Sequence, residues 1–454
     1  MFDKILIANR GEIAVRVARA CRELGLRTVA VYSEADRESM AVRLADEAIC
    51  IGPAAAKHSY LNAAAVLTAA RITGADAVHP GYGFLSESPD FADACRTAGV
   101  TLIGPPADVM AELGDKQSAR TLMAKAGLPL LPGSLDALEP DDAHALAEEI
   151  GYPVIVKAAA GGGGRGMRIV RDSAEFPEAY RETRATARML FGDSRVYVEK
   201  YLERARHVEI QVLCDGHGAG IHLGERDCSV QRRHQKLIEE SPAPHMPDGL
   251  AARMGRAAVE GVLAAGYVGA GTVEFLVDHA GNYYFMEVNC RIQVEHPVTE
   301  MVTGIDLVAE QIRIAAGLRL GYAQDQVVSR GAALECRVNA ENPAAGFAPT
   351  PACIATFMPP GGPFVRVDTH AYTGYSVPPN YDSLLAKVIV WSPDRDGAIA
   401  RMRRALAEFE IDGERLHTTR EFLMSVLDHA DFRSGNHSTA LVAEIIDDTV
   451  RNND

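Results

Sequence analysis

The segment KILIANRGEIAVRVARACRELGLRTVAVYS, residues 4–33, predicts the fold of the N-terminal part of the chain. Its first six residues are an apolar run typical of a short strand, and TVAVYS at 28–33 is a second one. Between them, apolar residues recur at helical spacing until Gly25, which favours a helix end: Ile13, Val17, Ala20, Cys21 and Leu24. Strand patterns return in DAVHPGYG (76–83) and TLIGPP (101–106). Alternating strands and helices form a buried parallel sheet, so we expect an α/β unit here.

The pattern changes near Gly114 and again near Arg330. A small α+β unit surrounds the strand-like YPVIVKA at 152–158, long alternating strands follow, and the last part is richer in Pro and Gly and ends in amphipathic helices. We therefore predict a multidomain chain of the α/β and α+β classes. Its predicted parts are an N-terminal domain at 1–113, a central domain at 114–329 with a mobile glycine-rich lid at about 131–203, a C-terminal α+β domain at 330–446 and a tail at 447–454.

Composition excludes several classes of protein. The formal net charge of −15 argues against nonspecific nucleic-acid binding, although a local basic pocket could still hold a small anion. None of the eight cysteines forms a CxxC pair, which argues against a zinc site and suits a reducing cytosol. The first ten residues lack the apolar region of a signal peptide, and no apolar run approaches the length of a membrane span. We expect a cytoplasmic protein with neither nucleic-acid nor membrane partners.

The glycine run at 161–166 lies between two strand patterns, VIVKA before it and MRIV after it. A dinucleotide fingerprint would open a helix, and the GxxxxGK[ST] phosphate loop is absent, so neither interpretation fits. A strand–glycine–strand hairpin could close its backbone amides over phosphate groups, with Lys157 adding a cation. A flexible surface hairpin without a ligand is the alternative.

Two acidic residues are predicted to face each other in a strand pair. TVEFLV (272–277) and YYFMEV (283–288) flank the turn signal DHAGN, and a loop centred between Ala280 and Gly281 places Glu274 opposite Glu287. Like charges that face each other destabilise a strand pair, so a cation is expected between them. Two carboxylates with the amide of Asn289 suit Mg²⁺ or Mn²⁺, which also recruit phosphate oxygens. A solvated face with a coincidental acidic pair is the alternative.

Two further patterns extend this candidate site. From 287 to 295, polar residues occupy the odd positions, so an extended chain would place them on one face: Glu287, Asn289, Arg291, Gln293 and Glu295. The even positions are apolar, with Cys290 packing away from the site. In ERDCSVQRRHQK (225–236), four basic residues share one parity and predict a strip for an anion: Arg226, Arg232, His234 and Lys236. A solvated basic edge is the alternative for this strip.

With these residues identified, nearly the whole chain resembles biotin carboxylase, the ATP-grasp component of acetyl-CoA carboxylase and related biotin-dependent carboxylases. The motifs that carry the resemblance include HPGYGFLSE (79–87), KAAAGGGGRGM (157–167), ERDCSVQRRHQK (225–236), MEVNCRIQVEHPVTEM (286–301) and ECRVNAE (335–341). The resemblance implies an N-terminal Rossmann-like domain, a central ATP-grasp domain with a lid, and a C-terminal biotin carboxylase domain.

The resemblance also implies roles by position. ATP contacts would be Lys116, Lys157, Gly163, Gly164, Glu199, Lys200, Tyr201, Leu202, His207, Gln231, His234, Glu274, Leu276 and Glu287. Metal ligands would be Glu274, Glu287 and Asn289, and the bicarbonate pocket would contain Lys236, Arg291, Gln293 and Val294. Biotin contacts would be Tyr82 and Arg337, and the catalytic set would be Lys236, Arg291, Glu295 and Arg337, with Glu295 as the base.

The implied reaction is the carboxylation of biotin at N1′ with ATP and bicarbonate, through carboxyphosphate. Since no Ala-Met-Lys-Met-like sequence occurs in the chain, we expect the biotin on a separate carrier protein, with carboxyltransferase subunits as further partners. The resemblance implies a homodimer through positions such as Arg19 and Glu23. The default acceptor is acetyl-CoA, in fatty acid synthesis.

Some features depart from the family pattern, and other functions remain open. Cys290, the segment DGERLHTTR (412–420) and PGGPFVR (360–366) are unusual for the family. The alternatives are the same half-reaction serving another acyl-CoA or pyruvate carboxylase, or a different ATP-grasp ligase such as the large subunit of carbamoyl phosphate synthetase. The third alternative is a non-enzymatic nucleotide-binding protein.

Overall fold

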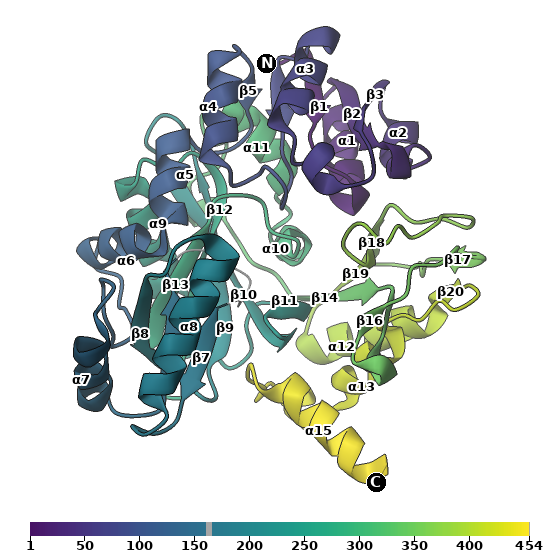
Figure 1. Ribbon diagram of the computed structural model, residues 1–454. Coiled ribbons are helices and arrows are strands. Elements are labelled where there is room, and N and C mark those ends of the chain that lie inside the picture. Colours follow the sequence, from purple (N-terminus) through teal and green to yellow (C-terminus); the bar gives the residue numbers. More distant parts are fainter. Residues whose placement is uncertain (160–165, 454) are drawn as a thin grey trace.

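A parallel sheet forms the N-terminal part of the structure, a computed structural model that describes residues 1–159 and 166–453 (Figure 1). In sheet order its strands are β3 (Glu47–Gly52), β2 (Arg27–Ser33), β1 (Lys4–Ile7), β4 (Ala77–His79) and β5 (Thr101–Leu102). The helices between them are α1 (Gly11–Glu23), α2 (Met40–Leu44), α3 (Ala63–Thr73) and α4 (Pro89–Thr97), with 3₁₀ turns η1 (Glu34–Asp36) and η2 (Ala56–His58). The parallel pairing of β1 with β2 and β4 confirms the predicted α/β unit.

Helix α1 is buried on more than one side. The predicted stripe, which includes Ile13 and Val17, packs against β1. The opposite side, which carries Glu12 and Arg16, is buried as well, because strand β18 (Val365–Thr369) of the C-terminal part lies against it. Gly25 follows the helix with a φ of +73°, a left-handed conformation that glycine adopts without strain. Glu12 and Arg16 therefore lie in the interior of the molecule.

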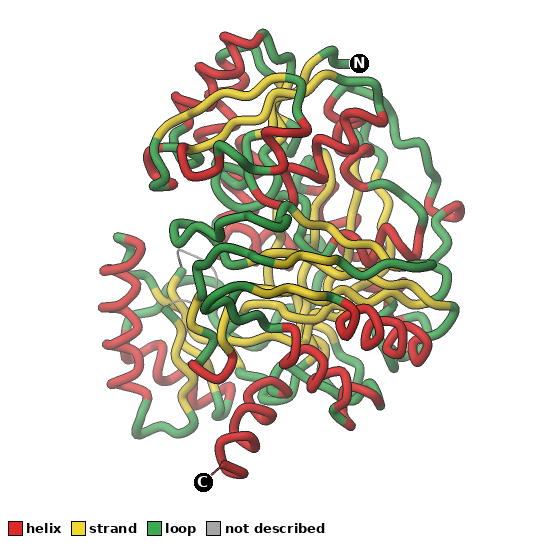
Figure 2. The backbone as a smooth tube through the Cα atoms, turned by 90° about the vertical axis from the view of Figure 1, so that its right-hand side faces the viewer, coloured by secondary structure: helices red, strands yellow, loops and turns green. Residues whose placement is uncertain are grey.

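The lid is a three-stranded antiparallel sheet with helices packed on it. Its elements are α7 (Pro140–Ile150), β6 (Val154–Ala158), β7 (Met167–Val170), α8 (Phe176–Phe191) and β8 (Val196–Lys200), and the sheet order is β7-β6-β8. Lys157 of β6 pairs with Met167 of β7, which confirms that the two predicted strands flanking the glycine run pair with each other. The predicted ATP contacts Gly163 and Gly164 lie outside the described residues. Figure 2 shows the lid as a separate group at the lower left of the molecule.

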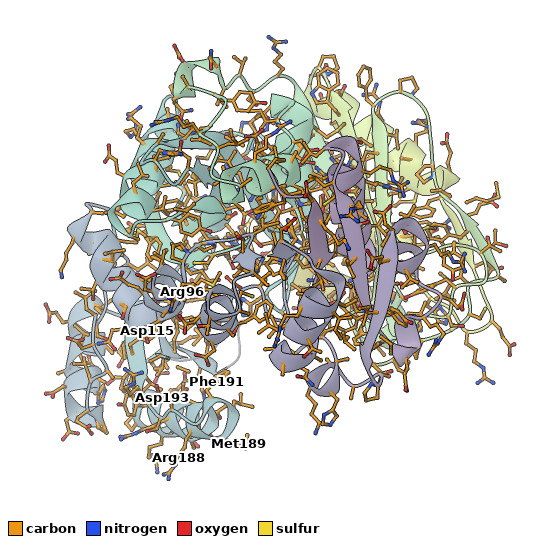
Figure 3. All side chains as sticks on the ribbon, turned by 90° about the horizontal axis from the view of Figure 1, so that it is seen from above. Arg96, Asp115, Arg188, Met189, Phe191 and Asp193 are labelled. Carbon is orange, nitrogen blue, oxygen red and sulfur yellow. The ribbon has the colours of Figure 1, made fainter. Side chains whose placement is uncertain are left out.

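One turn of the lid also contacts the central part. Asp193 follows α8 and forms an ion pair with Arg195 at 2.7 Å, and Arg195 Nη1 donates to Gln117 Oε1 at 3.3 Å. Gln117 belongs to α6 (Lys116–Lys125), whose first turn is capped by Asp115. Figure 3 labels Asp193 and Asp115 on this side of the lid. This turn of the lid is thus tied to the helix that begins with Lys116.

An eight-stranded antiparallel sheet joins the central and C-terminal parts. In sheet order its strands are β13 (Tyr283–Asn289), β12 (Gly269–Val277), β9 (Arg206–Cys214), β10 (Gly220–Arg232), β11 (Gln235–Ser241), β14 (Ala332–Asn339), β19 (Leu384–Ser392) and β18 (Val365–Thr369). Because β11 pairs with β14, the sheet runs across residue 330 without a break. The predicted domain boundary at that residue therefore does not coincide with a sheet edge.

Alternate residues of this sheet face different helices. Val212 packs with α9 (Leu250–Ala264), together with α5 (Ala107–Gly114) and α6, whereas its neighbour Leu213 packs with α11 (Leu307–Ala315). In the C-terminal half, Leu334 faces α12 (Arg395–Glu408) and Ala333 faces α10 (His296–Thr303). The two-residue period of the strands thus separates two apolar cores. Polar groups on the α10 side lie between the sheet and α1.

Short elements complete the C-terminal part. They are η3 (Gln324–Gln326), β15 (Glu341–Asn342), η4 (Pro343–Ala345), β16 (Ala348–Pro349), β17 (Thr356–Met358), β20 (Glu410–Asp412), α13 (Arg420–Asp428), α14 (Ala430–Arg433) and α15 (Leu441–Asn453). Among the described residues, no helix combines the length and the apolar character needed to cross a bilayer.

Candidate active site

The structure pairs Glu274 with Glu287 across β12 and β13, as predicted. The hairpin pairs Val277 with Tyr283, so its loop is centred on Ala280 rather than between Ala280 and Gly281, as predicted. A register shift between Glu274 and Phe275 then restores the predicted partner. The carboxylates face each other because of this bulge and not because of the loop alone.

Protein cations already neutralise one of the two carboxylates. Glu274 Oε1 accepts hydrogen bonds from Lys236 Nζ (3.0 Å), Asn289 Nδ2 (2.9 Å) and Gln293 Nε2 (3.1 Å), while His207 Nε2 lies 2.8 Å from Oε2. Burial alone would raise the pKa of Glu274, but Lys236 and His207 hold that pKa well below its usual value. The protein itself therefore supplies cations beside this carboxylate, in addition to the divalent cation that the sequence predicts.

Glu287 is in the opposite situation. Its carboxylate has no hydrogen bond or ion pair to any residue in the described ranges, and burial followed by the nearby Glu274 carboxylate raises its pKa. A cation beside Glu287 would relieve this repulsion. The donor set of Glu287, Glu274 and the amide of Asn289 consists of the oxygen ligands that Mg²⁺ prefers, so these residues fit a divalent cation.

Beyond Asn289, the predicted alternation is wrong. Strand β13 ends at Asn289, and Glu295 is the N-cap of α10, with φ −81° and ψ 8°. Pro297 favours a helix start in the first turn, and this signal was overlooked. The polar side chains meet nevertheless: Arg291 donates to Gln293 Oε1 (2.7 Å) and to Asn289 Oδ1 (3.0 Å). They gather through a turn rather than along one strand face.

Lys236 is the centre of the charged cluster. Its ammonium donates to Glu209 Oε2 (2.6 Å), Glu274 Oε1 (3.0 Å) and Glu295 Oε1 (2.5 Å). Burial opposes its charge, but Cys228 together with these acids raises the pKa of Lys236 well above its ordinary value. Two groups of side chains near Lys236 are close enough together to hold a metal ion. They are His207–Glu209–Glu274 and Glu209–Cys228–Glu295, and each includes acids that bind the Lys236 ammonium. A protein cation therefore serves both groups.

The predicted base and the predicted biotin arginine form an ion pair. Arg337 Nη2 donates to Glu295 Oε2 at 2.9 Å, and Arg337 Nε donates to Glu239 Oε1 at 2.6 Å. Burial alone would raise the pKa of Glu295, but Lys236, Arg337 and Arg226 hold it well below its ordinary value, so Glu295 is a carboxylate at neutral pH. Tyr82, the other predicted biotin contact, donates its hydroxyl to Glu12.

Basic residues from separate elements converge near the predicted ATP contacts. Burial, followed by the charges of Lys157, His207 and Lys116, lowers the pKa of His234. Gln231 Nε2 contacts His207 Nδ1 at 3.3 Å, and Leu276 is the cross-strand partner of His207. Lys157 and His207 are paired with Glu199 and Glu274, and the gathering of basic side chains around His234 is suited to an anion.

The segment Glu199–Leu202 is only partly a strand. Strand β8 ends at Lys200, so Tyr201 and Leu202 lie beyond it. Glu199 is buried and binds Lys157 Nζ at 2.6 Å, as well as Arg120. Lys200 Nζ donates to the carbonyl oxygens of Gly151 and Tyr152, in the lid.

The predicted basic strip is only partly correct. Arg226 and Lys236 both bind Glu209, and Arg226 also donates to Gln211, Thr272 and Thr299, so it is completely enclosed. Arg232 instead donates to the Gly346 carbonyl. Register shifts between Asp227 and Gln231 break the assumed alternation.

Several residues around the site were missed by sequence reasoning. Glu87 accepts from Arg291 Nε (2.8 Å) and from the Cys290 backbone N–H (3.0 Å), and Glu209 joins Lys236 to Arg226. The alternation His207, Glu209, Gln211 in a strand could have revealed Glu209. Glu239, Thr419, Lys387 and Glu12 lie far from their partners in sequence, so no local pattern marks them. Cys290 and Cys336 pack in apolar clusters, as expected.

Family models match three consecutive stretches of the chain. They are the biotin carboxylase N-terminal domain at residues 1–110, the carbamoyl-phosphate synthase L chain ATP-binding domain at 115–323, and the biotin carboxylase C-terminal domain at 335–444. Biotin carboxylase 1 of Bacillus subtilis is 56% identical over 97% of this chain and 98% of that protein. The chain belongs to the biotin carboxylase family. It is accordingly an ATP-grasp ligase with the three-part architecture of that family.

Other relatives of this biotin carboxylase family member include differently named enzymes. A pyruvate carboxylase component of Methanothermobacter thermautotrophicus is 52% identical over 98% of this chain and 90% of its own length. A biotin carboxylase–β,γ-ATP complex from Campylobacter jejuni superimposes with a TM-score of 0.95 at 46% identity, covering 98% of this chain and 99% of that chain. The biotin carboxylase domain dimer of Hydrogenobacter thermophilus 2-oxoglutarate carboxylase, in complex with MgADP, ADP and bicarbonate, gives 0.93 at 47% identity, with 98% of both chains covered.

Proposed function

We propose that the protein uses ATP and bicarbonate to carboxylate biotin at N1′, with ADP and phosphate as products. The observation that carries this proposal is the position of Lys236, whose ammonium touches Glu274 of the acidic pair and Glu295, the proposed base. Groups suited to a metal–nucleotide and groups suited to bicarbonate therefore meet at one atom. Membership of the biotin carboxylase family supports the same reaction.

ATP is the proposed nucleotide, with Mg²⁺ or Mn²⁺. The cations around His234 would hold the phosphates, namely Lys116, Lys157 and His207. Glu274, Glu287 and Asn289 would hold the metal, which supplies charge neutralisation to the phosphate oxygens. The Campylobacter and Hydrogenobacter structures, which contain β,γ-ATP and MgADP, support this assignment.

The first chemical step is proposed to be phosphorylation of bicarbonate. Glu295 takes the bicarbonate proton, and a carbonate oxygen attacks the γ-phosphorus of ATP as the bond to ADP breaks. Lys236, Arg291, Gln293 and the backbone of Val294 bind the anion. Such phosphoryl transfer depends on positioning and electrostatic stabilisation more than on covalent catalysis. The product is carboxyphosphate, which the lid must shield from water.

The second step is proposed to transfer CO₂ to biotin. Carboxyphosphate breaks its C–O bond to give CO₂ and phosphate. The phosphate takes the N1′ proton of biotin, and N1′ attacks CO₂. Arg337 stabilises the negative charge on the ureido oxygen, and Tyr82 contacts biotin from the N-terminal part. The ion pair of Arg337 with Glu295 supports this assignment, because it places the ureido partner beside the base.

Partners and acceptor follow from the family. We propose that the biotin is attached to a carrier protein, that a carboxyltransferase accepts the carboxyl group, and that the protein acts in the cytoplasm as a homodimer. The Hydrogenobacter relative is described as a dimer. Acetyl-CoA is the proposed final acceptor, in fatty acid synthesis. Relatives named for pyruvate and 2-oxoglutarate carboxylation make these acids the competing acceptors.

The test is bicarbonate-dependent release of ADP, measured with free biotin, with ammonia or with neither. We expect biotin to increase ADP release and carboxybiotin to accumulate. Stimulation by ammonia, with carbamoyl phosphate as product, would instead favour a carbamoyl phosphate synthetase activity, which the family model of the central segment keeps as the second candidate.

A further inference from the structure

Lys387 is a completely buried lysine on β19 to which neither the sequence nor the proposed reaction gives a role. Its ammonium donates to the carbonyl oxygen of Val294 at 2.8 Å and lies 3.0 Å from Glu12 Oε1. Its cross-strand neighbour is Arg337. A charge in such a position is expensive unless it is paired, so its partners are informative.

One end of this contact lies at the proposed bicarbonate site. Val294 is the residue between Gln293 and Glu295, and its carbonyl belongs to the turn that leads into α10. By binding this oxygen, Lys387 fixes the backbone between Gln293, whose side chain contacts Glu274, and Glu295, the proposed base. The turn belongs to the central part of the molecule, whereas β19 belongs to the C-terminal part.

The other end lies at the proposed biotin contact. Glu12, in α1 of the N-terminal part, accepts the hydroxyl of Tyr82 with the same Oε1 atom that faces Lys387. Burial raises the pKa of Glu12. Lys387 and the Tyr82 hydroxyl lower it and the charge of Asp368 raises it, and the net shift is upward. The chain Val294 O, Lys387, Glu12, Tyr82 therefore joins all three parts of the molecule.

Charge balance makes Glu12 the main counter-ion of Lys387. Asp368 lies 3.9 Å from the ammonium and is already paired with Arg366 at 2.7 Å. Glu335 is completely buried, neither of its carboxylate oxygens is hydrogen-bonded to a described residue, and burial raises its pKa well above the usual value. Burial opposes the charge of Lys387, but Glu12, Glu335 and Asp368 together raise its pKa.

We propose that Lys387 and Glu12 are positioning residues that hold the Val294 turn and Tyr82 in a fixed arrangement. This inference rests on the proposed function, which assigns Val294 to bicarbonate and Tyr82 to biotin. Neither residue touches a substrate. Each acts through a neighbour, so loss of the link displaces both substrate contacts and leaves the nucleotide side unchanged.

The test is Lys387→Met, which keeps the length of the side chain and removes its charge. We expect KM for bicarbonate, measured in ATP cleavage without biotin, and KM for free biotin each to rise about tenfold, equivalent to about 1.4 kcal/mol. KM for ATP should stay within about twofold of wild type. Arg395→Met is the matched control: it breaks the Arg395–Glu240 ion pair of 2.6 Å and should lower thermal stability without changing any KM.

Glu12→Gln provides a second variant should Lys387→Met fail to fold, since it keeps the shape of the side chain and removes only its charge. A rise in both the bicarbonate and the biotin KM supports the link. Unchanged values for both substrates in a stable variant overturn it. Wild-type protein must carboxylate free biotin in the same assays; failure there refutes the proposed function itself, whereas active wild type with unchanged variants refutes only the positioning role.

Discussion

Replacing the Glu295 carboxylate by the amide of glutamine should separate bicarbonate chemistry from nucleotide binding. Glu295 is buried and accepts from Lys236 Nζ at 2.5 Å and from Arg337 Nη2 at 2.9 Å. A glutamine keeps one acceptor oxygen, so one charge-assisted bond is lost, at a cost of about 1.5–3 kcal/mol. Lys236 retains Glu209 and Glu274, and Arg337 retains Glu239, so the variant should fold.

The effect on catalysis should be much larger than the effect on binding. Loss of a general base lowers turnover by about 10²- to 10⁴-fold, so kcat for bicarbonate-dependent ATP cleavage should fall within that range for Glu295→Gln. KM for ATP should remain within about threefold of wild type, because Glu295 is linked to the proposed nucleotide contacts only indirectly, by way of Lys236, among the described residues. ADP release, measured while ATP and bicarbonate are varied separately, gives both quantities.

Glu300→Gln is the matched control for this experiment. Glu300 lies in α10, of which Glu295 is the N-cap, and is also a buried acid bound to arginines, but it contacts neither Lys236 nor Arg337. It should retain wild-type kcat. The reasoning is refuted if Glu295→Gln keeps more than about a tenth of wild-type turnover, because that loss would be smaller than a general base is expected to cause. It is also refuted if KM for ATP rises as steeply as kcat falls.

Three further predictions test separate parts of the structure. Arg337→Ala should reduce biotin carboxylation more than bicarbonate-dependent ATP cleavage, and equal losses in parallel assays would remove its proposed separate role. Thr419→Val removes a hydroxyl that donates to the Arg337 carbonyl and accepts from the Asn339 N–H, both at 3.0 Å. Denaturant titration should show a loss of about 1–3 kcal/mol in unfolding free energy, and KM for biotin should rise while KM for ATP stays unchanged. An unaltered KM for biotin would contradict this prediction. Burial would raise the pKa of Glu300, but Arg16 with other positive neighbours lowers it to about 2. The stabilisation by this carboxylate is therefore complete above about pH 4.5 and is lost as the pH falls through 2. Wild type should be more stable than Glu300→Gln by about 3 kcal/mol at neutral pH, and this difference should disappear over that pH range; a constant difference would refute the linkage.

Local patterns explain what could be predicted from the sequence. The N-terminal parallel sheet follows from apolar periodicity within 4–33, where each element is specified by its own residues. The Glu274–Glu287 pair was predictable because a short loop joins its strands, although the bulge beside Phe275 was not. Local sequence therefore identified the acidic pair and the family motifs.

Long-range geometry explains what could not be predicted. The turn after Asn289 replaces an apparent strand because α10 begins at His296, and a two-residue alternation cannot distinguish these conformations. Lys387 binds a carbonyl 93 residues away, and Glu12 meets it only because α1 packs against the C-terminal sheet. The protein cations that neutralise Glu274 likewise come from β9 and β11, so the need for a metal could not be judged from β12 and β13 alone.

The most direct test of the account is the fate of bicarbonate oxygen. With ¹⁸O-labelled bicarbonate, unlabelled ATP and free biotin, the oxygen that attacks the γ-phosphorus stays on phosphorus when carboxyphosphate breaks its C–O bond. Mass spectrometry of the released phosphate should therefore show one ¹⁸O atom for each carboxybiotin formed. Carboxybiotin formed together with unlabelled phosphate would contradict phosphorylation of bicarbonate in this site.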